Sequence, residues 1–220
     1  MKNKALISVV VASVVLIGLF VFASKQYKTG VAEEASFVAR DQFTVFVPEH
    51  AIKKGDPKAK VFVVEFFDPE CESCRAFHPY MHSIMSDYEG KIQLVHRYAA
   101  FHPNSKFAIK ILEAARLQHK YWEALEILFQ HQPEWGNHHN PQPELIWNFL
   151  PRLGIDIAEV KKHMDDPSIQ AIIDQDAKDL QTLNVRATPT FFVNGKMVAE
   201  FGPDHLRAAI DEALKEVSSN

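Results

Sequence analysis

Hydrophobic residues along the chain are grouped in short apolar runs separated by longer stretches with helical spacing. Residues 61–67 form a mostly apolar run, which is typical of a strand buried on both faces. Residues 92–98 contain β-branched and aromatic side chains and predict the next strand. A shorter apolar segment, 43–47, predicts a first strand, and the polar residues 53–57 that follow predict a turn. Residues 72–88 have the spacing of an amphipathic helix.

The second half of the chain contains mostly helical patterns, followed by a hairpin. Apolar residues recur at helical spacing within residues 103–183. Residues 190–193 precede Asn194-Gly195, a dipeptide typical of two-residue hairpin turns, and residues 196–199 are predicted as the partner strand of the hairpin. A last helix is predicted with Asp204 as its N-cap. Because strands flank a block of helices, we expect an α/β fold with a central mixed sheet and an inserted helical subdomain.

The N-terminal segment differs from the rest of the chain. Residues 5–24 carry no charged side chain and are long enough to span a bilayer, which predicts a transmembrane anchor within residues 1–24. A cleaved signal peptide is the alternative, because Val21-Phe22-Ala23 places small residues at a possible cleavage site. Residues 25–42 are interpreted as a linker and 43–217 as the folded domain. Either interpretation predicts export to the periplasmic side, anchored to the inner membrane or released.

Charge and cysteine content restrict the class of function. The net charge of −4 argues against a nucleic-acid partner, which would require a basic surface. The two cysteines both lie in the window Cys71-Glu72-Ser73-Cys74, so no second disulfide can form within one chain. Outside the cytoplasm such a pair meets an oxidising environment, and a CxxC between a buried strand and a helix is typical of redox chemistry. We expect no cofactor beyond this cysteine pair.

Within that window, Cys71 is the candidate nucleophile and is expected to be partly exposed. The start of a helix offers unpaired N–H groups and a partial positive charge, which favour a thiolate. Cys74 lies one turn further on the same face, where we expect it to be buried and to resolve a mixed disulfide. The alternative is a metal-binding or metal-delivery protein, in which Cys71, Cys74 and His78 would supply ligands for zinc or copper.

Two segments resemble those of the DsbA-type thiol–disulfide oxidoreductases. Residues 64–75 (Val-Glu-Phe-Phe-Asp-Pro-Glu-Cys-Glu-Ser-Cys-Arg) resemble the family's active-site segment, and residues 185–195 resemble its cis-proline loop and following hairpin. The resemblance implies a thioredoxin fold with a helical insertion over about 103–183. It also implies unfolded or cysteine-containing exported proteins as substrates, and a membrane redox partner.

The resemblance assigns roles to residues outside the cysteine pair. Glu65 interrupts an apolar strand and matches an acidic residue that exchanges a proton as Cys74 changes state. Thr188 and Pro189 match the residues that bind an extended substrate segment, with the bond between them in cis. The resemblance favours disulfide formation. The acidic residues around Cys71, and Thr188, a residue type also found before the cis-proline of isomerases, keep reduction or isomerisation open.

The residues around Cys71 depart from the family's pattern. Ser73 stands where strongly oxidising members commonly have His, and Asp68, Glu70 and Glu72 bring three carboxyl groups close in sequence. Nearby negative charge raises the pKa of a thiol. The sequence therefore predicts a less stabilised thiolate and a weaker oxidant, unless these carboxylates point to water and are screened.

Overall fold

The structure is a computed structural model that describes residues 16–30 and 43–219. Residues 16–30 form a helix. Within these described ranges, no helix is both long enough and apolar enough to cross a membrane. Residues 5–15 of the predicted anchor and residues 31–42 of the predicted linker lie outside the described residues.

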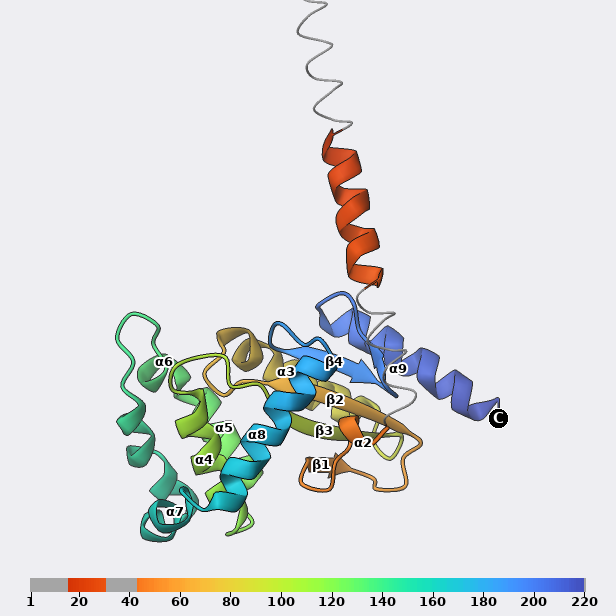
Figure 1. Cartoon of the computed structure of the whole chain (residues 1–220). Helices are drawn as coiled ribbons and strands as arrows, with labels where there is room; N and C mark the ends of the chain where they lie inside the picture. The colour runs from red at the N-terminus through yellow and green to blue at the C-terminus, as the bar shows by residue number, and fades with distance from the viewer. Residues whose placement is uncertain (1–15, 31–42, 220) are drawn as a thin grey trace, which may run out of the picture.

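The strands that the structure describes form one mixed sheet (Figure 1). They are β1 (Ile52–Gly55), β2 (Val61–Phe67), β3 (Ile92–Tyr98), β4 (Thr190–Val193) and β5 (Lys196–Met197). Their order across the sheet is β1-β3-β2-β4-β5. The central strands β2 and β3 run parallel, and every other neighbouring pair is antiparallel. The predicted mixed sheet is confirmed.

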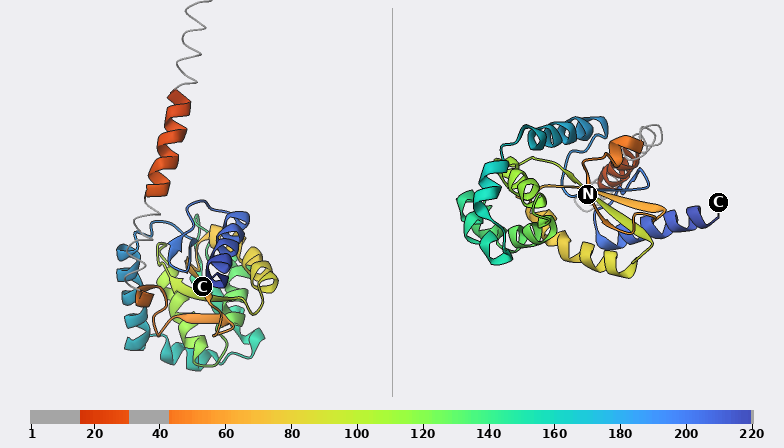
Figure 2. Two further views of the ribbon diagram at one scale, coloured as in Figure 1. Left: turned by 90° about the vertical axis from the view of Figure 1, so that its right-hand side faces the viewer. Right: turned by 90° about the horizontal axis from the view of Figure 1, so that it is seen from below.

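Helices cover both faces of this sheet. They are α2 (Phe43–Phe46), α3 (Glu72–Asp87), α4 (Ser105–Arg116), α5 (Tyr121–Gln130), α6 (Gln132–Trp135), α7 (Ile157–His163), α8 (Pro167–Thr182) and α9 (Pro203–Ser218), with the 3-10 helices η1 (Pro143–Asn148) and η2 (Leu150–Leu153). Figure 2 shows α8 on one face of the sheet and α3 with α9 on the other. Helices α4 to α7 lie beyond one end of the sheet (Figures 1 and 2).

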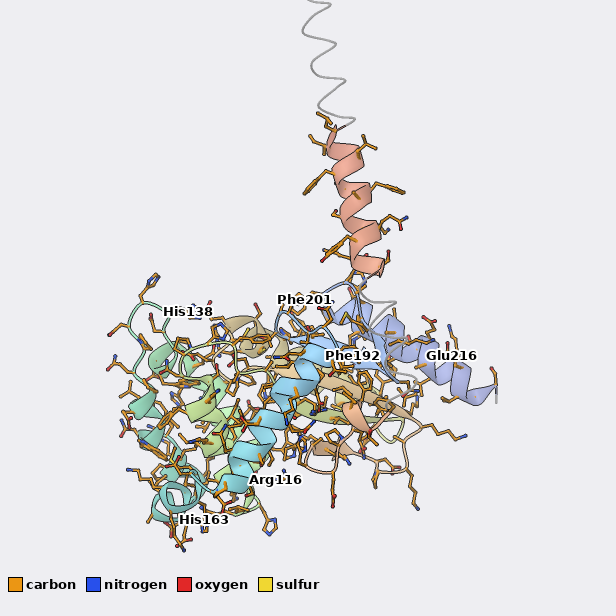
Figure 3. All side chains as sticks on the ribbon, in the orientation of Figure 1. Arg116, His138, His163, Phe192, Phe201 and Glu216 are labelled. Carbon is orange, nitrogen blue, oxygen red and sulfur yellow. The ribbon has the colours of Figure 1, made fainter. Side chains whose placement is uncertain are left out.

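The apolar core follows these layers. Under α8 and α2, the buried side chains include Phe46, Phe66 and Phe192, whose rings meet edge to face. Figure 3 shows Phe192 within the sheet, whereas His138 projects from the loop between α6 and η1. The helices beyond the end of the sheet have their own buried cluster, which reaches the sheet at Phe67 and includes both cysteines. The cysteine pair therefore lies where the sheet meets the helical insertion.

A buried ion-pair cluster fixes α8 onto β3. The guanidinium of Arg97, which is 0% exposed, lies 2.7 Å from the Asp176 carboxylate and 2.5 Å from that of Asp179. It also donates to the carbonyl oxygen of Val45, which precedes the sheet. The other carboxylate oxygen of Asp176 accepts from the backbone N–H of Tyr98 at 2.6 Å. One arginine thus connects three elements that are distant in sequence.

Two predicted elements at the start of the domain were wrong. Residues 43–47 form the short helix α2 rather than a strand, because a brief apolar run fits both periodicities. The predicted turn at 53–57 falls within and just after the edge strand β1, which pairs with β3. Ile52 is the one buried residue of β1, so its charged positions gave no apolar signal.

Two boundaries near the C-terminus also differ from the prediction. Helix α9 has Gly202 rather than Asp204 as its N-cap, because Pro203 at the first helical position already has the backbone angle that a helix requires. Asp204 lies in the first turn instead. The hairpin is present, but β5 covers Lys196–Met197 and ends two residues earlier than predicted.

Candidate active site

Cys71 lies at the junction between the end of β2 and the start of α3. It is the N-cap residue of α3, with the extended backbone angles φ −75° and ψ 122°, and its carbonyl accepts from the N–H of Arg75 at 3.1 Å. Cys74 is 0% exposed, as expected, and Cys71 is 7% exposed, less than expected. The two sulfurs are not joined in a disulfide. The site therefore leaves a small part of Cys71 accessible and covers Cys74 completely.

The surroundings of Cys71 stabilise its thiolate. The hydrogen bond from the Cys74 side chain is the largest cause that lowers the pKa of Cys71, from 9.0 to about 5. Burial opposes this change, while the Thr188 side chain and the backbone N–H groups of Ser73 and Cys74 add to it. N–H groups at a helix start have no partner within the helix, which is why they can serve the sulfur.

Cys74 has the opposite character. Burial raises its pKa well above the ordinary value of 9.0, and the hydrogen bond with Cys71 acts in the same direction. The backbone N–H of Asp68 donates to the Cys74 sulfur at 3.5 Å. The negative charge of Glu65 is a further, smaller cause of the raised pKa of Cys74. At neutral pH the pair thus consists of an outer thiolate and an inner thiol.

The cis-proline loop lies against the outer sulfur. The Thr188–Pro189 peptide bond is cis, as the resemblance implied. The Cys71 thiol lies 3.4 Å from the backbone carbonyl oxygen of Thr188 and donates to it when protonated. Pro189 is buried and leads directly into β4. Two segments separated by more than one hundred residues therefore meet at Cys71.

Glu65 lies inside the sheet beneath the cysteines. It is 4% exposed, and its carboxylate lies 3.2 Å from Nε2 of His96, its register partner on β3. The interaction has the distance of an ion pair but not the geometry of a hydrogen bond, since His96 Nε2 has no hydrogen-bond partner. His96 was missed by sequence reasoning, because no motif surrounds it in the sequence of β3.

The expectation that three carboxyl groups raise the pKa of Cys71 was wrong for this structure. Asp68 is 0% exposed and turns to the loop after β3, where it accepts from the backbone N–H of Phe101 at 2.9 Å and from the hydroxyl of Ser105 at 2.7 Å. It also lies 2.8 Å from Nδ1 of His102. Burial alone would lower the pKa of His102, but the hydrogen bond and charge of Asp68 outweigh it and raise that pKa.

Glu70 and Glu72 differ from each other. Glu70 is 3% exposed, and its two oxygens accept from the backbone N–H and the side-chain amide of Asn104 at 2.6 and 2.7 Å. Glu72 and Ser73 are exposed. Asp68 and Glu70 therefore fasten the active-site segment to the loop at 101–105, which their position beside the cysteines in the sequence did not reveal.

Gln132 is a second residue that sequence reasoning missed. It is 1% exposed, and its side-chain amide donates to the carbonyl oxygens of Pro69 and Cys71 at 2.8 and 3.0 Å. Its own oxygen accepts from Nε of Arg75 at 2.9 Å. Gln132 stands in a proline-rich stretch that carries no sequence signal for this contact. Helix α6 of the insertion thus holds the backbone of the cysteine window.

The predicted metal-ligand set does not come together. Nε2 of His78 lies 2.8 Å from the Glu126 carboxylate and 3.1 Å from Nε2 of His82. Among the residues that the structure describes, the group that fits a metal ion consists of these three side chains and neither cysteine. The metal alternative built on Cys71, Cys74 and His78 therefore loses its third ligand.

Comparison with known proteins decides the family. Residues 48–212 match the family model described as thioredoxin. The chain belongs to the thioredoxin family. A thioredoxin-like oxidoreductase from Silicibacter pomeroyi is 27% identical, with a TM-score of 0.68, and the match covers 78% of this chain and 96% of that one. BdbD from Bacillus subtilis is also 27% identical, with a TM-score of 0.66 over 74% of this chain and 92% of that one.

Within the thioredoxin family, the fold is that of DsbA-type thiol–disulfide oxidoreductases. The thiol–disulfide exchange protein alpha-DsbA2 from Wolbachia pipientis has a TM-score of 0.72 over 82% of this chain and 96% of its own, and at 21% identity it supports the fold alone. Among curated relatives, a Na(+)/H(+) antiporter NhaA 3 from Salinispora tropica is 30% identical over 73% of this chain. The chain spans about a quarter of that relative's length, 24%.

Proposed function

We propose that this thioredoxin-family chain is an extracytoplasmic thiol–disulfide oxidoreductase that forms disulfides in protein substrates. The observation that carries the proposal is the arrangement of the two sulfurs. Cys71 lies at the start of α3 with a pKa of about 5, and Cys74 lies beneath it with a pKa well above 9.0. Such a pair is suited to receive a substrate sulfur at Cys71 and to release Cys74 as the internal thiol.

The proposed reaction begins from the Cys71–Cys74 disulfide. A substrate thiolate attacks the Cys71 sulfur, so a substrate–Cys71 bond forms and the Cys71–Cys74 bond breaks. Cys74 leaves with the electron pair and takes up a proton, for which the protonated form of buried Glu65 is the proposed donor. A second substrate thiolate then attacks the substrate sulfur of the mixed disulfide, and Cys71 leaves as a thiolate. The substrate is oxidised by two electrons and the cysteine pair is reduced.

The ionisation of Cys71 supports disulfide formation as the direction. A thiol of low pKa is a good leaving group, and stabilising its thiolate stabilises the reduced form of the pair, which makes the disulfide more oxidising. Thiolate pKa values range from about 7 in thioredoxin to about 3.5 in the most oxidising proteins of this kind. A value of about 5 places Cys71 between them, which revises the weaker oxidant predicted from the acidic residues.

Substrate contacts are proposed for the cis-proline loop. Thr188 is half-buried beside the Cys71 sulfur, and its backbone faces the site. An extended peptide segment can pair with such a backbone in the manner of an added strand, which brings any cysteine-containing sequence to Cys71. The proposed substrates are therefore unfolded or cysteine-containing exported proteins. A membrane redox partner is proposed to reoxidise the pair, and the N-terminal segment to place the domain on the periplasmic side.

Reduction or isomerisation by the same site is the second candidate, since both would use Cys71 as the attacking thiolate. The experiment that separates the candidates supplies the full chain, in oxidised or reduced form, to reduced and to scrambled ribonuclease. We expect the oxidised chain to restore activity of the reduced substrate stoichiometrically. Isomerisation would be favoured, and the proposal contradicted, if the reduced chain speeds the recovery of scrambled ribonuclease while the oxidised chain fails to oxidise reduced ribonuclease.

The two cysteines provide a matched pair of variants. Cys71→Ser removes the attacking sulfur and should abolish oxidation of substrates. Cys74→Ser keeps Cys71 but removes the resolving sulfur, so the variant should accumulate a mixed disulfide with substrate that non-reducing electrophoresis detects. Retention of activity by Cys71→Ser would remove the central claim.

A further inference from the structure

A cluster of three metal-binding side chains lies apart from the cysteines. His78 and His82 are one helical turn apart on α3, and Glu126 reaches them from α5. The Glu126 carboxylate oxygen lies 2.8 Å from Nε2 of His78 and 3.4 Å from Nε2 of His82, and the two Nε2 atoms lie 3.1 Å apart. Three donor atoms therefore converge on one point from two helices.

The dimensions of this triangle suit zinc. Zinc binds imidazole nitrogen and carboxylate oxygen at about 2.0–2.2 Å, so adjacent ligand atoms in a tetrahedron lie about 3.4 Å apart. The three measured separations are 2.8, 3.1 and 3.4 Å. An ion about 1 Å out of the plane of the three atoms would lie about 2 Å from each of them. Two histidines spaced i and i+4 on one helix face are a recurrent zinc-binding pattern.

The chemistry of the donor set selects the class of ion. Two imidazoles and one carboxylate favour zinc and similar divalent transition ions, whereas calcium and magnesium prefer oxygen ligands alone. His78 and His82 also line a cavity of about 360 Å³ next to α3. That cavity leaves room for water as the fourth ligand, which a zinc site with three protein ligands requires.

We propose that His78, His82 and Glu126 form a binding site for a divalent cation of the zinc class that links α3 to α5. Helix α3 begins in the cysteine window, and α5 belongs to the helical insertion, which lies between β3 and β4 in the sequence. The ring of His78 also packs against Phe129 of α5, with centroids 4.9 Å apart, so the two helices are already in contact at this point. A bound ion would hold them together more firmly. The site is separate from the proposed thiol–disulfide exchange and does not depend on it.

The test uses the full-length chain with Cys71 and Cys74 joined in a disulfide, so that no thiolate can bind metal. Zinc titration by calorimetry should show one saturable site. Cobalt, as a spectroscopic substitute, should give visible absorption of nitrogen and oxygen ligation without a thiolate charge-transfer band. Zinc in about 100-fold excess over its dissociation constant should raise the melting temperature by about 5–10 °C.

Variants of the exposed ligands assign the site. His82 and Glu126 have side chains 51% and 57% exposed, so His82→Ala and Glu126→Gln should fold normally. Each should weaken zinc binding by at least about 10–100-fold, the loss found when even an outer partner of a metal ligand is removed.

The matched control is His163→Gln. His163 pairs with Glu159 at 3.1 Å across one helical turn, an exposed histidine–carboxylate pair without a second histidine. This variant should bind zinc like the unmodified chain. Absence of saturable binding by the oxidised chain, or equal loss in His82→Ala and His163→Gln, would overturn the proposal and leave the three side chains as a hydrogen-bonded network.

Discussion

Replacing Cys74 with alanine should raise the pKa of the Cys71 thiol. The Cys74 side chain supplies the largest of the interactions that hold the pKa of Cys71 at about 5, ahead of Thr188 and the N–H groups at the start of α3. Alanine removes this donor and leaves the other groups in place. Cys74→Ser is the matched variant, since it also lacks the second sulfur but keeps a hydroxyl that can donate to Cys71.

The size of the effect follows from the two limiting pKa values. At pH 7 a thiol with a pKa of about 5 is about 99% ionised, whereas a thiol with the ordinary value of 9.0 is about 1% ionised. Complete loss of stabilisation would thus lower the thiolate fraction about 100-fold. Because Thr188 and the backbone N–H groups remain, we expect Cys74→Ala to lose part of this range and Cys74→Ser to lose less.

The assay is the rate of alkylation by iodoacetamide between pH 3 and 9, with thiolate absorbance near 240 nm as a second measurement. In the unmodified reduced chain, Cys71 alone should react below pH 8, because Cys74 is 0% exposed and its pKa is raised well above 9.0. The midpoint should lie near pH 5 and move upward in Cys74→Ala. Identical midpoints in Cys74→Ala and Cys74→Ser, or a midpoint near 9 in the unmodified chain, would refute this account of the thiolate.

Three further predictions concern redox balance and stability. The reduction potential of the Cys71–Cys74 pair should fall by about 30 mV per pH unit between pH 6 and 8 and by about 60 mV per unit below pH 5. The slope changes because reduction takes up one proton above the pKa of Cys71 and two protons below it. Equilibration with glutathione or dithiothreitol measures the potential, and a uniform slope of about 60 mV per unit up to pH 8 would contradict the low pKa of Cys71. The reduced chain should gain stability relative to the oxidised chain as pH rises from 5 towards 9. The pKa of Cys71 is lower in the folded than in the unfolded chain, so the thiolate stabilises the folded state at higher pH and this effect is lost as pH falls through 5. Thermal unfolding of both forms at pH 5 and 8 tests this, and a stability gain of the reduced chain that shrinks as pH rises would contradict it. Arg97→Met should lower the free energy of unfolding by about 3–5 kcal/mol, because it leaves two buried carboxylates without their partner. The control, Arg152→Met at an exposed position, should change this free energy little. Equal effects of the two variants in denaturant unfolding would contradict a stabilising role of the buried cluster.

The sequence was sufficient for the architecture at its centre. Residues 61–67 and 92–98 form strands with the predicted bounds, because the first is a mostly apolar run and the second contains β-branched and aromatic side chains. The helix after the cysteines was also predicted within one residue at its end. The edge strand β1 and the helix α2 were not, since one buried residue in a charged strand and four apolar residues in a helix give no distinctive period.

At the site, the sequence identified the two cysteines, Glu65 and the cis-proline loop, but neither His96 and Gln132 nor the directions of the acidic side chains. Cys71, Cys74 and Glu65 lie as expected in relation to β2 and α3. The acidic neighbours were misjudged, because closeness along the chain does not determine where a carboxylate points. Asp68 turns to the loop after β3, where it accepts backbone N–H groups that no local pattern predicts. Contacts of this kind depend on the fold as a whole.

Buried and exposed positions divide residues 68–74 into two sets that differ in how readily they tolerate substitution. Asp68 and Glu70 are held by the loop at 101–105, and Gln132 holds the backbone carbonyl of Cys71 from below. Glu72 and Ser73 face solvent between the two cysteines. Substitution of these two residues can therefore alter the electrostatic potential at the sulfur without disturbing the scaffold. In evolution or in design, the redox poise of this protein can be adjusted at two surface positions while the frame that holds the sulfurs stays constant.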